Sequence, residues 1–375
     1  MTKRDVVEDF LLNNIKHISS FDPNNSTIDK YKNGNFGLST IGFSLYSNGH
    51  NLRGKSTHHK YGLLYEDGEN IVSIGYFRKE TDIELADGYI FFTAPAGPNI
   101  ADIILDIIGR VSMSELPVKG FYVRYLNLEN YLSLLSKGGL PIKESPWHPE
   151  ASEEDETFNN SLVDIDNVIS LSEDSFTINK IEGLSKNSKK KIKYAFARFT
   201  NFLTRNNLVY RLEYLEDYNS QVAFKIIKSH FEMLRKYGKN IGSTPEDHFN
   251  AVDPSILKNR SCMGFIGFLS EIPVSIFVGE SISDDTFALY TPFTLRDTDL
   301  IDTLFPIDKM QEFTGLSAMP TYAYVQLLYI LKRKGFKYVD FGGSELADLN
   351  KFKRQMGGEN KPSYWTYFPI KKDLL

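Results

Sequence analysis

Cysteine is almost absent from this sequence of 375 residues, in which Cys262 is the only one. A single cysteine cannot form an intrachain disulfide or build a multi-cysteine metal site. The histidines, including His58 and His59, lack metal-ligand spacing with carboxylates, so we expect no metal centre. The cysteine content is compatible with a reducing compartment.

Long hydrophobic runs are missing as well. No stretch approaches the ~20 apolar residues that a helix needs to cross a bilayer. Charged residues interrupt every apolar segment between positions 1 and 20, so the sequence starts without the apolar region of a signal peptide. We therefore predict a cytoplasmic protein with no membrane span.

The sequence also has no excess of positive charge. The sequence has 43 Lys and Arg against 48 Asp and Glu, which gives a net charge of −5. Proteins that coat nucleic acid are usually basic overall. We expect no general DNA binding, although a local basic site is compatible with this balance.

Apolar and aromatic residues are well represented. Hydrophobic residues make up 41% of the sequence and charged residues 24%, which is ordinary for a soluble globular protein. The 27 Phe and 21 Tyr carry large buried areas and suit strands packed beneath helices. A chain of this length favours two domains.

The first half of the sequence has a clear order of elements. An amphipathic helix is expected over Val6–Ile18, with Val6 on its apolar stripe. Apolar runs at 61–65 and 71–77 flank an Asp67-Gly68 turn, which supplies the positive-φ position of a hairpin. After the hairpin the pattern predicts, in order, a strand at 88–92, a helix at 100–111 and a strand at 121–126.

The second half repeats this order. Apolar runs at 263–269 and 273–279 predict a second hairpin. The elements expected after it are a strand at 286–291, a helix at 320–335 that starts with Pro320 and ends at Gly335, and a strand at 337–341. Such self-similarity indicates duplication of one structural unit.

The repeat leads to a prediction of fold class and domains. We expect a mixed α/β (α+β) protein of two tandem domains, each a mixed twisted sheet flanked by helices. The domains are assigned to residues 1–150 and 181–375. Residues 151–180, which include the acidic run 153–156, form a predicted solvated connector.

A basic segment follows the connector. Residues 183–199 predict a helix that Ser185 or Asn187 can cap, and its basic residues crowd the first turns. Cations at a helix N-terminus oppose the helix dipole, whereas the free N–H groups there attract anions. The pattern therefore suggests a phosphate site, and a solvated basic face is the alternative. The basic residues proposed to bind phosphate are Lys186, Lys189, Lys190, Lys193 and Arg198.

A second constellation lies near the C-terminus. The strand at 337–341 runs into Gly342-Gly343, where the lack of Cβ allows a sharp exit or a closely approaching ligand. A short helix carrying Lys351, Lys353 and Arg354 should follow. Ligands of sheet proteins commonly bind outside the carboxyl ends of strands, although a structural turn and a surface helix fit the same sequence.

These two segments resemble a known group of enzymes. The order is Ser185-Lys186, a basic run at 189–191 and Ile192-x-x-Ala195, then Asp-Phe-Gly-Gly from Asp340 and Leu-x-x-Phe-Lys-x-x-x-Gly-Gly from Leu349. This order is similar to the FemABX peptidoglycan-bridge aminoacyltransferases. It is also similar to the wider GNAT-like transferases, which include phosphatidylglycerol lysyltransferases and polysaccharide-linked acetyltransferases. The resemblance covers mainly residues 183–200 and 318–370 and implies two GNAT-like halves.

The resemblance also implies an activity. FemABX enzymes transfer an amino acid from aminoacyl-tRNA to an amine, and Lys353 of the Phe352-Lys353 pair would lie beside the reacting carbonyl. We expect Lys353 to stabilise the oxyanion, with Gly342, Gly343, Phe352 and Arg354 in the substrate site. Asp340 is the candidate general base, with a cap or a salt bridge as its alternative role.

The donor and the acceptor stay open at this point. The sequence shows no Gly-rich cradle for pyrophosphate between strand and helix, since the first half offers only Ala94–Asn99. This favours aminoacyl-tRNA over acyl-CoA as the phosphate-bearing donor, with an amine or hydroxyl acceptor and no tightly bound cofactor. The alternatives are an acetyl- or acyl-CoA-dependent N-acyltransferase acting on a sugar or small amine, and a GNAT-derived binding protein without turnover.

Overall fold

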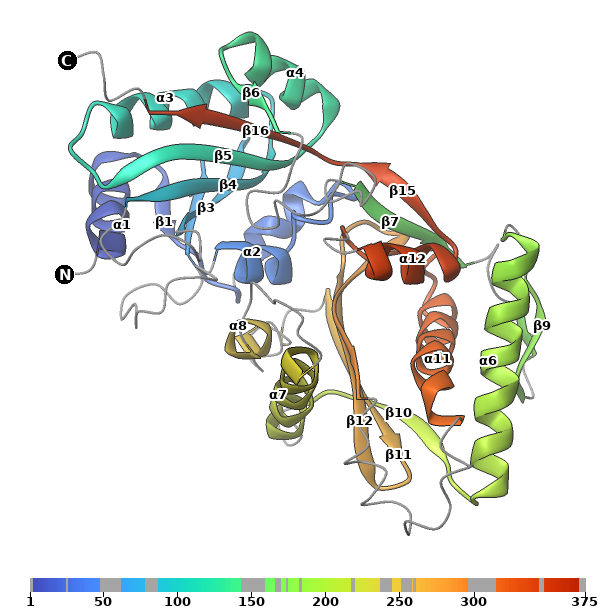
Figure 1. The fold of residues 1–375 in the computed structure, drawn as a ribbon. Coiled ribbons are helices and arrows are strands. Elements are labelled where there is room, and N and C mark those ends of the chain that lie inside the picture. The colour runs from blue at the N-terminus through green and yellow to red at the C-terminus, as the bar shows by residue number, and fades with distance from the viewer. Residues whose placement is uncertain are drawn as a thin grey trace. The chain divides into compact units, whose positions relative to one another are not determined.

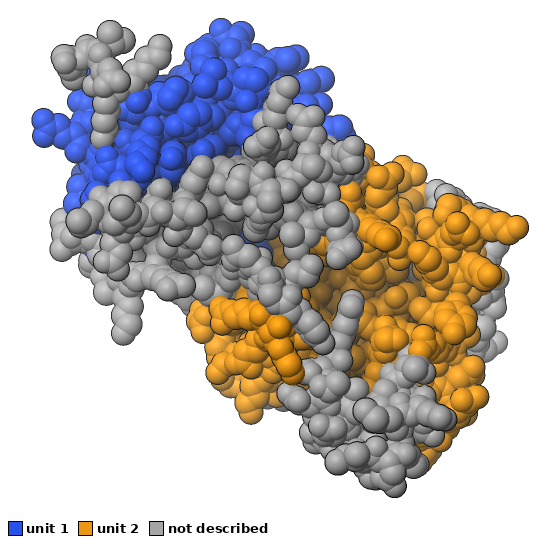
Figure 2. All heavy atoms as spheres, viewed as in Figure 1, with its two compact units in different colours: residues 1–160, 343–347, 361–375 blue, residues 161–342, 348–360 orange. Residues whose placement is uncertain are grey.

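The structure is a computed structural model. It describes residues 3–24, 26–47, 62–77, 87–142, 159–165, 170–172, 175–181, 184–216, 220–236, 245–250, 258, 261–295, 315–343 and 347–370. The chain splits into two compact units, coloured separately in Figure 2. Unit 1 comprises Met1–Asn160, Gly343–Ala347 and Lys361–Leu375, and unit 2 comprises Ser161–Gly342 and Asp348–Asn360.

Unit 1 is built on a seven-stranded sheet in the order β1-β2-β3-β4-β5-β16-β6. Its strands are β1 (Ile18–Ser20), β2 (Leu63–Glu66), β3 (Ile71–Phe77), β4 (Gly88–Ala96), β5 (Val118–Leu126), β6 (Leu140–Pro141) and β16 (Tyr364–Pro369). Its helices are α1 (Lys3–Asn14), η1 (Ser26–Tyr31), α2 (Thr40–Ser47), α3 (Ile100–Ser112) and α4 (Leu128–Ser136). The core on one side of the sheet joins α1, α3 and α4 to the strands.

Unit 2 has a seven-stranded sheet in the order β10-β11-β12-β13-β14-β7-β15. Its strands are β7 (Asn159–Asp164), β10 (Tyr210–Tyr214), β11 (Cys262–Leu269), β12 (Ile272–Ser281), β13 (Thr286–Thr294), β14 (Tyr338–Asp340) and β15 (Gly358–Pro362). Its helices are α6 (Lys186–Arg205), α7 (Ser220–Lys236), α8 (Pro245–Asn250), α11 (Met319–Arg333) and α12 (Ala347–Gln355). Figure 1 shows α7 and α11 on opposite sides of these strands, and β8 (Ser170–Ser172) pairs with β9 (Ser175–Lys180) in a small separate sheet.

The two large sheets are built in the same way. Each sheet begins this repeat with a hairpin, β2–β3 or β11–β12, and a third strand, β4 or β13, pairs antiparallel with it. A crossover helix then leads to a fourth strand, β5 or β14, which pairs parallel with the third. The crossover helices are α3 and α11, which correspond to the helices expected at 100–111 and 320–335. The predicted mixed α/β class and the predicted repeat are therefore confirmed.

Each sheet contains one strand from the other half of the sequence. The sheet of unit 1 takes β16 between β5 and β6, and the sheet of unit 2 takes β7 between β14 and β15. We call β16 and β7 the exchanged strands. The sequence-based prediction places β16 in the domain 181–375 and β7 in the connector 151–180, and periodicity reports that a strand forms and not where it pairs. Part of the expected connector 151–180 is the strand β7, while its acidic run 153–156 lies outside the described residues.

The first helix differs in detail from its prediction. Helix α1 ends at Asn14, and Ile18 begins β1 instead of closing the helix. Val6 is 39% exposed, whereas Val7, Leu11 and Ile15 enter the core. The expected stripe was therefore one residue out of register at its start.

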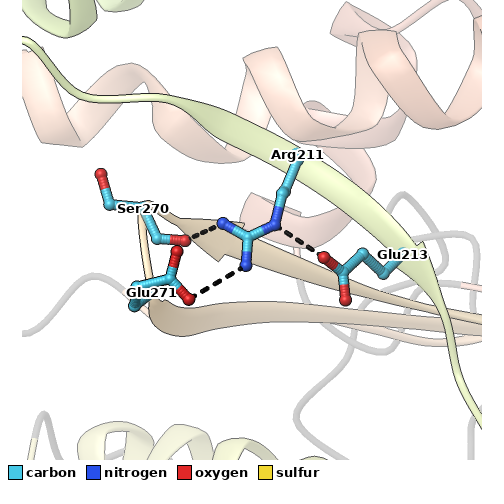
Figure 3. Close-up of polar contacts among 4 residues, drawn as sticks. All are labelled: Arg211, Glu213, Ser270 and Glu271. Atoms are coloured by element: carbon cyan, nitrogen blue, oxygen red, sulfur yellow. Dashed lines mark hydrogen bonds and ion pairs between the residues drawn. The ribbon is translucent and has the colours of Figure 1, made fainter.

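The open edge of the unit 2 sheet is fixed by an arginine. Arg211 of β10 donates its Nε to Glu213 at 2.6 Å and lies 3.4 Å from Glu271, and it also donates to the carbonyl oxygen of Ser270 (Figure 3). Ser270 has a φ of +54° in the β11–β12 turn. The guanidinium thus ties the edge strand to the turn of the neighbouring hairpin.

The described helices do not include one with both the length and the apolar character needed to cross a bilayer.

The exchanged strand β16 should be essential to unit 1. Phe368 is 7% exposed and belongs to the unit 1 core, so Phe368→Ala should cost about 3 kcal/mol of folding free energy. Hydrogen exchange followed by mass spectrometry should then speed up in the peptides of β3 to β5 and stay unchanged in β11 to β13. Met113→Ala, at a side chain that is 84% exposed, is the matched control and should stay within about 0.5 kcal/mol of the parent.

Candidate functional site

The amine of Lys353 is held inside unit 2. Lys353 lies in the last turn of α12 and is only 6% exposed. Its Nζ donates a hydrogen bond of 3.0 Å to the carbonyl oxygen of Gly342. A lysine is rarely buried without partners, because removing an ammonium from water is costly. This burial separates Lys353 from the exposed Lys351 and Arg354 of the same helix.

The end of β14 shapes the peptide that receives this amine. Asp340 is fully buried, and its Oδ1 accepts a hydrogen bond of 2.8 Å from the backbone N–H of Gly342. An aspartate that bonds the backbone two residues onward closes an Asx turn. Gly342 has a φ of +68°, a conformation that glycine adopts without a steric penalty.

The exchanged strand β7 completes the site. The N–H of Ser161 donates to Gly342 O at 3.1 Å, and the N–H of Phe341 donates to Ser161 O at 2.8 Å. Gly342 O therefore accepts from both Ser161 and Lys353. Strand β7, which is far from this region in the sequence, thus meets the end of β14 and helix α12 at one carbonyl oxygen.

Aromatic packing fixes α12 above this point. The ring of Phe352 meets Tyr324 of α11 edge-on at 5.1 Å, and the ring of Phe341 meets Tyr324 at 5.6 Å. Buried aromatic pairs of this kind stabilise a contact by about 1 kcal/mol beyond the area that they bury. Phe352 is thus a packing residue beside the Lys353 site, and Gly343 is half-buried.

The basic residues of α6 form a surface of their own. Ser185 caps the helix by accepting the N–H of Ser188 at 3.2 Å, as the sequence suggested. The sequence of α6 contains no acidic residue. Its proposed phosphate-binding residues are exposed at Lys186, Lys190 and Lys193 and half-exposed at Lys189 and Arg198. We call these five side chains the α6 basic surface.

An aromatic ring belongs to the same surface. Tyr194 is 65% exposed, and the guanidinium of Arg198 lies 5.9 Å from the centre of its ring. The opposite stripe of α6 is buried, and Phe196 stacks on Tyr322 of α11 at 4.7 Å. The helix therefore packs through one side and presents cations on the other.

The structure joins some of the predicted site residues and leaves others apart. Hydrogen bonds link Lys353, Gly342 and Asp340 into one group, whereas the α6 basic surface lies on a different helix of the same unit. Helices α6 and α12 contact α11 through Tyr322 and Tyr324, which project from different sides of that helix because they are two residues apart.

Ser161 was not predicted as a site residue. It lies in the segment expected to be a connector, and it enters the site through its backbone. Backbone groups carry no residue-specific signal, so only the pairing of β7 with β14 could reveal its part.

In unit 1, a side chain of the protein itself lies at the start of the crossover helix α3. The N–H of Asn99, just before α3, donates to Asn70 Oδ1 at 2.9 Å. A Cβ on Gly97 would lie 2.5 Å from that same oxygen, and Asp102 adds a negative charge in the first turn of α3. The N–H of Asn99 is thus engaged within unit 1, and Asp102 would oppose an anion at this end of α3.

A buried cation in unit 1 was also not anticipated. Arg124 of β5 is 5% exposed and donates its Nε to Thr93 Oγ1 at 2.9 Å. Its guanidinium lies 5.1 Å from the ring of Phe91 and 5.7 Å from that of Trp365, which comes from the exchanged strand β16. Cation–π contacts of this kind lower the cost of burying the charge.

Comparison with known proteins identifies the fold. No family model matches the sequence, and no curated protein matches it. The chain is similar to a conserved protein of unknown function from Bacteroides thetaiotaomicron VPI-5482, with a TM-score of 0.61, 10% identity and coverage of 93% of this chain and 98% of that one. It is similar to FemX with a TM-score of 0.55, 10% identity and coverage of 93% and 96%. The chain has the fold of FemX, as two tandem GNAT-like units, and at this identity the likeness is one of fold.

The Gly342 turn can be tested by substitution. Because φ is +68°, Gly342→Ala should destabilise unit 2 by about 1–2 kcal/mol. Gly109 of α3 has open space around its Cβ position, so Gly109→Ala should stabilise unit 1 by about 0.5–1 kcal/mol. Denaturant unfolding measures both, and equal effects of the two substitutions would contradict the requirement for glycine at position 342.

Proposed function

We propose that this protein is an acyltransferase that moves an aminoacyl group from aminoacyl-tRNA to an amine or hydroxyl acceptor. The observation that carries the proposal is the buried Lys353 amine held by Gly342 O at 3.0 Å. A cation kept at a strand end, with a glycine turn beside it, is suited to stabilise negative charge that develops on a carbonyl oxygen.

The transfer reaction requires few other groups from the protein. The acceptor's neutral amine or hydroxyl attacks the ester carbonyl, and a new amide or ester bond forms. The bond to the ribose oxygen of the tRNA breaks, and the proton lost by the acceptor ends on that oxygen. An ammonium has three N–H donors; Gly342 O holds one, and we assign another to the developing oxyanion. Because the ester already has a good leaving group, positioning and charge stabilisation can provide most of the rate.

The α6 basic surface supports a polyanionic donor. Its cations, on a helix without acidic residues, stand out in a chain of net charge −5. Lysines that meet phosphates release counterions, and this release drives binding of nucleic acids without regard to sequence. The exposed Tyr194 adds a ring on which an unpaired base can stack.

Loss of the Lys353 amine should abolish most turnover. Lys353→Ala should lower the transfer rate by about 10²–10³, the effect of losing one oxyanion donor. Lys351→Ala, at the exposed neighbour on the same helix, should keep the parental rate. In the assay, total tRNA is charged with a mixture of radioactive amino acids and incubated with the enzyme and a panel of amines and amino sugars. The rate at which radioactivity is lost from the tRNA is measured.

A parallel reaction with labelled acetyl-CoA distinguishes the donors. Turnover with acetyl-CoA and none with charged tRNA would overturn the tRNA proposal and support the CoA-dependent alternative. Turnover with neither donor would support a binding protein. Full activity of Lys353→Ala would remove the role given to its amine.

Charge reversal on α6 tests the donor surface. Replacing Lys186, Lys190 and Lys193 by Glu should weaken binding of uncharged total tRNA. The slope of log K against log salt should fall by about one for each phosphate that α6 no longer neutralises. Replacing Lys225, Lys228 and Lys236 of α7, which are also exposed, by Glu changes the net charge equally and is the matched control. Equal losses in the two triple variants would show that overall charge, and not α6, governs binding.

A further inference from the structure

Asp340 has a place in the site that differs from that of a proton acceptor. We propose that it is a positioning residue, which holds the Gly342 turn so that its carbonyl oxygen fixes the Lys353 amine. The inference rests on the proposed function only for the chemical role of Lys353. The arrangement itself stands on the geometry of unit 2.

The Asp340 carboxylate is engaged by the backbone of its own turn. The side chain is fully buried, and Oδ1 accepts the Gly342 N–H at 2.8 Å. Hydrogen bonds from a short polar side chain to the backbone two residues onward fix the local turn. This oxygen therefore restrains the backbone at the exit of β14.

Gly342 is held at both its nitrogen and its oxygen. Its N–H is bound by Asp340, and its carbonyl oxygen accepts from Lys353 at 3.0 Å and from Ser161 at 3.1 Å. The N–H belongs to the peptide before Gly342 and the carbonyl to the peptide after it, and the two are joined through the backbone angles of Gly342, the residue type with the widest backbone freedom. The Asp340 hydrogen bond restrains the first peptide, and this restraint adds to the hold that Ser161 has on the oxygen.

Two substitutions at position 340 distinguish an oxygen acceptor from a charge. An asparagine retains an Oδ1 that can accept the Gly342 N–H, but it cannot accept a proton from a substrate. Alanine removes both capacities. The pair Asp340→Asn and Asp340→Ala therefore separates turn-holding from base catalysis.

The experiment measures the reactivity of the Lys353 amine in the full-length protein, without any donor. Acetyl N-hydroxysuccinimide labels free amines, and peptides from a protease that does not cut at lysine report Lys353 and Lys351 together. In the parent protein Lys353 should react much more slowly than the exposed Lys351. Asp340→Ala should raise the ratio of the Lys353 rate to the Lys351 rate by about tenfold, as expected for the loss of one buried hydrogen bond. Asp340→Asn should keep the parental ratio.

Two results would overturn the inference. One is an unchanged ratio in Asp340→Ala, which would show that the turn holds the amine without Asp340. The other is an equal rise in both variants at parental melting temperatures, which would show that charge is what matters. Thermal unfolding of each variant verifies folding, and labelling in denaturant sets the unprotected limit.

The same variants separate the two roles during turnover. A positioning role predicts that Asp340→Ala lowers kcat and that Asp340→Asn restores part of the loss. A base role predicts equal losses in both variants and the disappearance of one limb of the pH–rate profile. Because labelling needs no donor, a failed turnover assay leaves the positioning test intact, and the two proposals fail independently.

Discussion

The carbonyl oxygen of Gly342 is the point on which the candidate site depends. It accepts a hydrogen bond from the Lys353 amine and another from the Ser161 backbone. Strand β14, strand β7 and helix α12 are fixed relative to one another at this atom. The carbonyl is polar and fixed in position by the sheet, so it offsets part of the cost of burying the amine.

The site lies in a sheet that contains an exchanged strand. Each sheet has the same strand order, and each receives its sixth strand from the other half of the sequence. The exchanged strands also deliver the residues that distinguish the two units. Strand β7 brings Ser161 to the Lys353 site, and β16 brings Trp365 to the ring set around Arg124.

The two units share one topology but bury different cations. In unit 1 Asn70 accepts the N–H just before α3, and aromatic rings lie against the buried cation Arg124. In unit 2 the buried cation is a lysine on a short helix after a glycine turn. The exposed cations of α6 also belong to unit 2. This asymmetry is why we place the proposed reaction in unit 2.

The local elements could be predicted from the amino-acid sequence. Asp67-Gly68, Pro320, Gly335 and the spacing of apolar residues were enough for the hairpins, the crossover helices and the repeat, because these depend on neighbours along the chain. The Phe352-Lys353 pair could also be singled out from its resemblance to known enzymes. The exchange of β7 and β16, the burial of Lys353 and the acceptor that it shares with Ser161 became visible only in the folded chain. These features depend on pairings between residues far apart in the chain, and backbone groups contribute to such pairings whatever side chain they carry.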